Sequence, residues 1–145
     1  MIGLLQRVTA AQVVVEGNTM ASIETGILVL VGFQANDQVE HIPRFIERIT
    51  EFRMFSDNSG KMNQSVGDKG GELLWVPQFT LAADTQSGRR PSFSKAAPPP
   101  VAKALFDSLM GDAQKTFPRS QFGQFGAHME VTLTNNGPVT FWIEI

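Results

Sequence analysis

Residues 26–33 read Gly-Ile-Leu-Val-Leu-Val-Gly-Phe, an unbroken apolar run that the polar segment 34–37 follows. A short apolar run without alternation is typical of a strand that is covered on both faces. We therefore expect residues 27–33 to form a central strand, around which the rest of the chain is arranged. The run is far shorter than the about 20 apolar residues of a membrane-spanning helix.

Further strands are expected on either side of this run. Residues 1–9 and 11–16 are β-branched and apolar, and Gly17-Asn18 supplies a turn, so a hairpin should open the fold. Downstream, residues 73–76 have the pattern of another buried strand. After an interruption by proline, we expect that strand to continue as residues 78–81.

Two segments have apolar residues at helical spacing, residues 42–52 and residues 101–109. In the first, arginine and glutamate occupy the opposite face, which indicates an amphipathic helix. Its start is open to two interpretations. Asp37 with Glu40 resembles a capping box, whereas Pro43 suits the first helical turn better.

The end of the chain consists of an alternating run, residues 129–134, and a second run, residues 139–145, joined by Asn-Asn-Gly-Pro at 135–138. Asn-Gly between alternating runs is a strong hairpin signal, so we expect these residues to join the last two strands. Pro138 removes a backbone donor, and the Gly137-Pro138 bond has a few-per-cent prior of being cis. Taken alone, this dipeptide favours an ordinary turn with trans proline.

Length and composition predict one domain, residues 1–145, with an aliphatic, phenylalanine-rich core. The chain has no cysteine, which excludes disulfides and thiolate metal sites and fits the cytosol. Its first residues lack a basic leader followed by a long apolar stretch. We therefore expect a soluble, cytoplasmic protein that has no membrane partner.

The charge balance argues weakly against a nucleic-acid partner, because the net charge is −2 and the pI is about 5.6. One local cluster favours such a partner. Arg89, Arg90 and Lys95 place three positive charges within a loop-like stretch of seven residues. A solvated loop and a phosphate contact are equally open explanations of this cluster.

The usual hydrolytic residues are missing. The two histidines, His41 and His128, form no metal-binding pair, and no G-x-S-x-G motif is present. Ser92-Phe93-Ser94-Lys95 matches S-x-x-K but lacks the companion motifs of that enzyme class. Two features remain as candidate sites: the polar segment Gln78-Phe79-Thr80 in an apolar context, and the Gly137-Pro138 tip.

Several separate motifs, taken together and in order, resemble the D-aminoacyl-tRNA deacylase family from end to end. They are Arg7 in Gln6-Arg7-Val8, Phe55-Ser56-Asp57 with Gly60-Lys61-Met62-Asn63, Gln78-Phe79-Thr80-Leu81-Ala82, Arg90-Pro91-Ser92-Phe93-Ser94, and Asn136-Gly137-Pro138-Val139-Thr140. The set is far more specific than any one of its members.

The resemblance implies an α/β fold with three β/β/α layers, in which mixed sheets form a barrel-like core beside two main helices. It also implies a homodimeric esterase that needs no cofactor or metal and removes D-amino acids, and glycine, from the 3′ end of aminoacyl-tRNA. The ribose 2′-hydroxyl of the tRNA assists the attack. In the family the Gly-Pro bond is cis, and the tip of each subunit enters the other's pocket, where two carbonyl oxygens exclude an L side chain.

Site residues follow from the same resemblance. Gln78, Phe79 and Thr80 would line the catalytic side of the pocket, with the backbone N–H groups of Phe79 and Thr80 as donors to the ester. The residues expected to bind the substrate and select its handedness are Gly137, Pro138, Arg7, Met129 and Pro77. The candidate tRNA contacts, Arg89, Arg90 and Lys95, come from the local cluster of positive charge and not from the resemblance.

This chain departs from the family pattern at Pro77, where the family has serine before Gln-Phe-Thr. A hydroxyl and a backbone donor are lost, so a tRNA-end binding module without turnover stays open as an alternative. A small oligomeric protein that uses its Gly-Pro turn only for packing is a third hypothesis, which the set of motifs disfavours.

Overall fold

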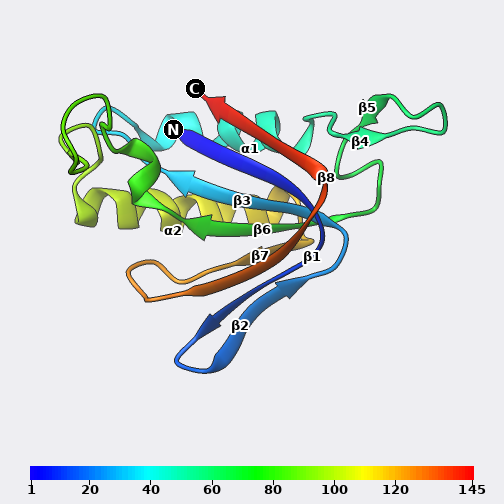
Figure 1. The fold of residues 1–145 in the computed structure, drawn as a ribbon, viewed down its shortest axis with the longest axis horizontal. Helices are drawn as coiled ribbons and strands as arrows, with labels where there is room; N and C mark the ends of the chain where they lie inside the picture. Colours follow the sequence, from blue (N-terminus) through cyan, green and yellow to red (C-terminus); the bar gives the residue numbers. More distant parts are fainter.

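The computed structural model describes residues 1–145. It consists of one large, strongly curved sheet of six strands, with two α-helices packed against it, and a separate two-stranded sheet (Figure 1). The strands are β1 (Ile2–Val15), β2 (Asn18–Ile23), β3 (Gly26–Gly32), β4 (Phe55–Ser56), β5 (Met62–Gln64), β6 (Glu72–Pro77), β7 (Ser120–Phe122) and β8 (Glu130–Glu144). The helices are α1 (Ile42–Thr50) and α2 (Pro99–Thr116), with the 3-10 turns η1 (Val39–His41) and η2 (Phe79–Ala82).

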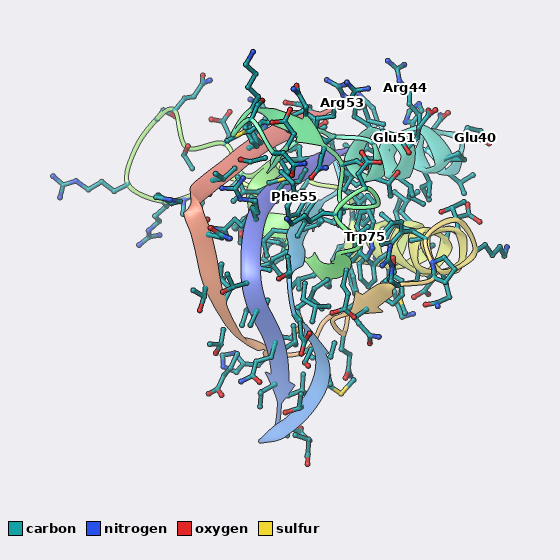
Figure 2. All side chains as sticks on the ribbon, turned by 90° about the vertical axis from the view of Figure 1, so that its right-hand side faces the viewer. Glu40, Arg44, Glu51, Arg53, Phe55 and Trp75 are labelled. Atoms are coloured by element: carbon teal, nitrogen blue, oxygen red, sulfur yellow. The ribbon has the colours of Figure 1, made fainter.

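The central strand is β3, as the sequence predicts. It pairs antiparallel with β1 and parallel with β6, and six of its seven residues are buried. The sheet order is β2-β1-β3-β6-β7, with β8 on the other edge of β1. The sheet is therefore mixed and nearly closed into a barrel, and both helices lie on one side of it (Figure 2). The expected fold class is confirmed.

The opening hairpin is also confirmed, but β1 is one continuous strand rather than two. Its first half pairs with β3 and its second half with β2, while β8 follows it along most of its length. The turn to β2 uses positive φ at Glu16 (49°) and Gly17 (78°), a conformation that glycine adopts without steric cost. One long strand thus links the two halves of the curved sheet.

Three expected strand assignments are wrong. Residues 78–81 do not continue β6, because the chain turns into η2 directly after Gln78. Residues 135–138 are not a hairpin turn, because both flanking runs belong to β8 and pair with β1, not with each other. The tip is an irregularity within one strand, opposite Arg7, where the register between β1 and β8 shifts. Met129, the first residue of the expected run 129–134, precedes β8 instead of lying in it.

Helix α1 begins at Ile42, with Pro43 in its first turn, so the proline signal was the correct one of the two. The capping box exists, but Gln38 and His41 form it around η1. The carboxylate of Asp37 instead accepts hydrogen bonds from the Met1 ammonium and the Gln34 N–H, both at 2.7 Å.

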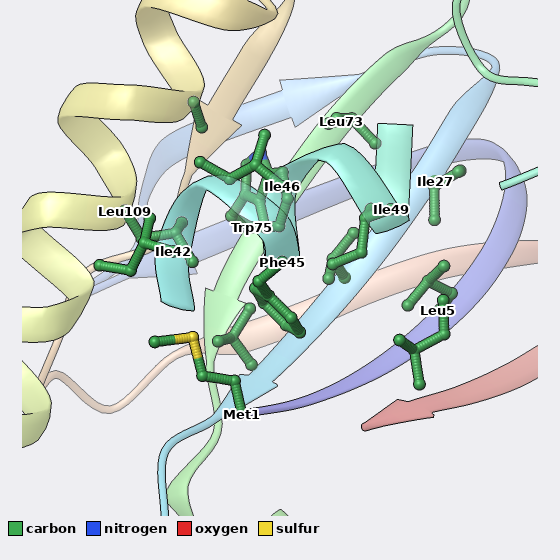
Figure 3. Packing of buried hydrophobic residues seen from close by; sticks show 14 of the residues in the cluster. Met1, Leu5, Ile27, Ile42, Phe45, Ile46, Ile49, Leu73, Trp75 and Leu109 are labelled. Atoms are coloured by element: carbon green, nitrogen blue, oxygen red, sulfur yellow. The ribbon is translucent and has the colours of Figure 1, made fainter. Parts of the chain in front are cut away.

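The core lies between α1, α2 and the sheet (Figure 3). Apolar residues of α1 point toward the strands, and the Phe45 ring lies 6.5 Å from that of Trp75. The indole N–H of Trp75 donates to Ser120 Oγ at 3.1 Å, so this buried polar group is satisfied. This packing fixes β6, whose carboxyl end carries the candidate site. Neither helix combines the length and apolarity needed to cross a bilayer.

Candidate active site

The candidate catalytic segment begins where β6 ends. The Gln78 N–H donates to Val31 O of β3 at 2.7 Å, and the Gly123 N–H donates to Trp75 O on the β7 side at 2.8 Å. Because successive residues of a strand point their backbone groups to alternate neighbours, the nitrogen of Pro77 faces the β7 side. Pairing with β7 ends at Trp75, so proline costs the ladder no hydrogen bond here.

After Gln78 the chain enters η2 and packs closely on β3. A Cβ atom on Gly32 would lie 2.9 Å from Leu81 Cβ and 3.1 Å from Gln78 O, so glycine at this position allows the approach. Phe79 and Thr80 are the first two residues of η2, where backbone N–H groups have no partner within the helix. Both residues are exposed. The segment therefore has two backbone N–H donors without a partner in η2, both in exposed residues.

The side chains of this segment are ordered by one contact. Gln78 Nε2 donates to Thr80 Oγ1 at 2.5 Å, and neither histidine nor lysine contacts that hydroxyl. A nucleophilic threonine needs an adjacent base to take its proton. The geometry therefore suits Thr80 to positioning a substrate rather than to covalent attack.

Met129 joins this segment through Gly123. A Cβ atom on Gly123 would lie 2.9 Å from Met129 Sδ and 3.5 Å from Pro77 Cδ, so the two side chains flank the same glycine. The Gln124 N–H donates to Met129 Sδ at 3.3 Å and fixes the sulfur. Five predicted site residues, 77–80 and Met129, thus gather at the carboxyl end of β6.

The second group of predicted residues forms the β8 tip. The Gly137-Pro138 peptide bond is cis, as the resemblance implies, and both residues are exposed. Arg7 braces the tip, since its Nε donates to Asn136 O at 3.1 Å. Asn135 holds the tip from within β8, because its Oδ1 accepts the Val139 N–H at 2.9 Å.

The tip and the catalytic segment lie far apart in one chain. Arg7 pairs with Ile27 and Ile27 with Leu73, so the tip lies level with Leu73 at the start of β6. Pro77 is four residues further along β6, about 13 Å, and β1 and β3 separate β8 from β6 at about 4.8 Å per strand. The bend of β8 and the end of β6 accordingly lie on opposite sides of the molecule (Figure 1). The tip does not line the catalytic segment of its own chain.

The three predicted tRNA-contact residues share a loop but differ in environment. Lys95 Nζ forms an ion pair with Asp84 at 3.0 Å. The pKa of Asp84 is lowered, mainly by the Gln86 N–H and then by Lys95. Arg89 and Arg90 are exposed and form no ion pair. These two arginines therefore carry the uncompensated positive charge of the loop.

A sequence model of the D-Tyr-tRNA(Tyr) deacylase family matches residues 4–144. The chain belongs to this family. Among its relatives, a protein of Nitrosococcus oceani named D-aminoacyl-tRNA deacylase is 52% identical over 145 residues, covering 100% of this chain and 94% of that protein. A protein of Legionella pneumophila (strain Lens) with the same name is 51% identical over 144 residues, covering 99% of each.

Two solved structures have the same fold as this family member. One, titled c-Myc DNA Unwinding Element Binding Protein, is 37% identical, has a TM-score of 0.94 and covers 100% of this chain and 99% of its own. The other, titled as a probable eukaryotic D-amino acid tRNA deacylase, is 16% identical with a TM-score of 0.89, covering 99% and 98%. The latter supports the fold alone.

Sequence reasoning on this deacylase-family chain missed three residues near the site. Gly32 allows η2 to pack on β3, and Gly123 allows Met129 to pack beside Pro77. Such contacts are visible only in the three-dimensional structure. Phe93 was part of a quoted motif, yet nothing in the sequence shows that its ring lies 5.0 Å from that of Phe79. The structure brings no group of three His, Cys, Asp or Glu side chains together as metal ligands.

Proposed function

We propose that this chain hydrolyses the ester bond of D-aminoacyl-tRNA and releases the free amino acid and the tRNA. Membership of the deacylase family and relatives about half identical to it under that name support the reaction. Because tRNAs are aminoacylated in the cytoplasm, we also propose that the protein acts in that compartment. Glycyl-tRNA is a second substrate, because glycine has no side chain to exclude.

The chemistry needs little from side chains. Water adds to the ester carbonyl carbon, the backbone N–H groups of Phe79 and Thr80 stabilise the resulting oxyanion, and the bond to the ribose 3′-oxygen breaks. The 3′-oxygen leaves with a proton, and the adjacent ribose 2′-hydroxyl assists the transfer. A base supplied by the substrate agrees with a Thr80 hydroxyl whose one hydrogen-bond partner is the Gln78 amide.

Selection of handedness comes from a second copy of the chain, in a symmetric homodimer. The observation that carries this proposal is the separation of the tip from the catalytic segment, which leaves the pocket without its second wall in one chain. Residues 136–138 of the partner would fill it, with two backbone carbonyl oxygens in the space that an L side chain needs. Rejection by exclusion leaves D-aminoacyl and glycyl esters to react.

The test is hydrolysis of D-alanyl-, L-alanyl- and glycyl-tRNA side by side under single-turnover conditions. We expect the D and glycyl esters to be cleaved and the L ester to survive. Tight binding without single-turnover cleavage would favour the tRNA-end binding module, and similar rates for both enantiomers would contradict exclusion. Sedimentation in the same buffer gives the oligomeric state, and an active monomer would contradict the shared pocket.

A substrate ending in 2′-deoxyadenosine tests the proposed assistance separately. The D-aminoacyl ester on its 3′-oxygen should be bound as before but cleaved at least about a hundredfold more slowly, the usual scale of general acid–base catalysis. An unchanged rate would assign the proton transfer to the protein or to solvent.

A further inference from the structure

Two phenylalanine side chains lie exposed at the rim of the candidate active site. Phe79 is 56% exposed and Phe93 is 41% exposed, whereas the other phenylalanines are buried or partly buried. Their rings touch, with centroids 5.0 Å apart and planes inclined by 50°. An exposed aromatic pair of this kind offers a flat apolar surface beside Thr80.

The backbone around Phe93 is fixed at both ends. An isolated bridge joins Asp84 to Ser92 before it, and another joins Gln34 to Ala96 after it. The Ala96 N–H also donates to Phe93 O at 3.1 Å. The ring is thus held at the surface by an anchored segment and is not left exposed by a loosely packed loop.

Positive charge is carried by the loop that directly precedes Phe93 in the chain. Arg89 and Arg90 belong to the loop that the first bridge closes, and neither is neutralised by a carboxylate. On the other flank of the segment, Met129 Sδ and Pro77 Cδ lie beside Gly123. A phosphate backbone that leaves the site past the phenylalanines is therefore attracted by these two arginines.

We propose that the Phe79–Phe93 pair stacks the bases just upstream of the terminal nucleotide of the tRNA, while Arg89 and Arg90 contact the phosphates of that segment. The inference rests on the proposed function, since it names how the single-stranded end of the same substrate is held. Stacking on aromatic side chains is tolerant of sequence, because every base has a π face.

The test compares two substrates on Phe93→Leu: D-alanyl-tRNA, and D-alanyl-adenosine, which has no upstream base. We expect kcat/KM for the tRNA to fall about fivefold to twentyfold, mostly through KM, with less than a twofold change for the nucleoside ester. Phe93→Tyr should restore most of the loss because it keeps the ring. Trp142→Leu, which removes an exposed aromatic side chain from β8, is the matched control and should leave both substrates unaffected.

The outcomes separate this inference from the proposed function. If the unaltered protein cleaves neither substrate, the proposed function fails. If it cleaves both and Phe93→Leu changes neither or changes both equally, the stacking inference is overturned. A shift in sedimentation of Phe93→Leu would also overturn it, because the pair would then be covered by a partner subunit.

A binding readout independent of turnover uses Phe93→Trp in a Trp142→Phe background, which leaves buried Trp75 as the only other indole. Titration with a short uncharged RNA ending in CCA should quench the new indole through stacking, and the midpoint should rise with salt. Replacing Arg89 and Arg90 by glutamine should raise that midpoint severalfold and weaken its salt dependence. Absence of quenching at saturating RNA would overturn the proposal.

Discussion

Arg7 and Asn136 are joined across the β1–β8 pair, since Arg7 Nε donates to Asn136 O at 3.1 Å. The same guanidinium donates through Nη1 to Met54 O at 2.7 Å. One planar group therefore ties the β8 tip to the chain just before β4. Lysine cannot reproduce this fork, because its ammonium is a single point of charge.

We predict that Arg7→Lys lowers the ratio of D- to L-alanyl-tRNA hydrolysis by about tenfold to a hundredfold, which corresponds to loss of one hydrogen bond to a charged group. The fold should be retained, because Arg7 is only half-buried and lysine keeps the positive charge and a long side chain at this position of β1. The control is Arg119→Lys. Arg119 Nη1 donates a comparable hydrogen bond to Gly70 O at 2.7 Å, and this contact is remote from the tip. Equal selectivity of Arg7→Lys and the unaltered protein would contradict the bracing role.

Gly137 should accept no side chain. A Cβ atom there would lie 2.7 Å from Val139 Cγ2, 3.0 Å from Val139 N and 3.2 Å from Arg7 Nη2, and its φ is 135°. We predict that Gly137→Ala loses at least about tenfold in D-alanyl-tRNA cleavage or in discrimination, because displacement of about an ångström is costly at such sites.

The control for this change is Gly17→Ala, which also has a positive φ (78°) but has no atom within 4 Å of the added Cβ. It should lower stability slightly and leave both rates unaltered. If Gly17→Ala and Gly137→Ala behave alike in activity assays, general destabilisation explains the effect and the tip has no special role.

The parts of the fold that sequence patterns predicted are those decided locally. The central strand, the opening hairpin and both helices follow from residue periodicity and turn chemistry. The wrong assignments depend on distant partners. Residues 135–138 look like a hairpin turn, but β1 is long enough to pair with both halves of β8, and Asn135 satisfies the Val139 N–H in place of the ladder.

In the candidate site, too, local sequence identifies the residues, whereas their spatial relations depend on distant parts of the chain. The motifs supply the candidate residues, and the structure gathers 77–80 and Met129 at one end of β6. Their spacing in the sequence does not reveal that Gly123 lies between Pro77 and Met129, or that the tip lies level with Leu73. Such relations depend on sheet order and register, which are set by the packing of the whole chain.

The β3–β6 pair should be sensitive to one methyl group. A Cβ atom on Gly26 would overlap the carbonyl oxygen of Glu72, a backbone atom that cannot rotate away. We predict that Gly26→Ala lowers the free energy of unfolding by about 1–3 kcal/mol, the usual cost of overpacking. Gly111→Ala, in α2 with open space around the added Cβ, should raise it by about 0.4–1 kcal/mol. Urea unfolding at one fixed protein concentration measures both, and equal stabilities would contradict the register.

The β4–β5 turn should lose its order in acid. Hydrogen bonds from the side chains of Ser59 and Asn63 and from the Lys61 N–H lower the pKa of Asp57 from 3.8 to about 2. Because the folded pKa is the lower one, the contribution of Asp57 is present above pH 3.8 and is lost as the pH falls toward 2. The Ser59 amide resonance should report this transition by NMR, and Asp57→Asn should abolish it. A midpoint at or above pH 3.8 would contradict the hydrogen-bonded turn.

Pro77→Ser should be tolerated and should favour activity. The nitrogen at this position faces the β7 side beyond the last paired residue, and the bond to Val31 O comes from Gln78, so serine adds a donor without removing a ladder contact. We predict unchanged thermal stability and a kcat/KM for D-alanyl-tRNA between that of the unaltered protein and about tenfold above it. Pro77→Ala restores the backbone N–H without the hydroxyl, so comparison with Pro77→Ser separates the effect of the N–H on kcat/KM from that of the hydroxyl. If both variants lose activity by more than tenfold, Pro77 has a role of its own in holding η2 against β3, and the missing serine is no handicap to this chain.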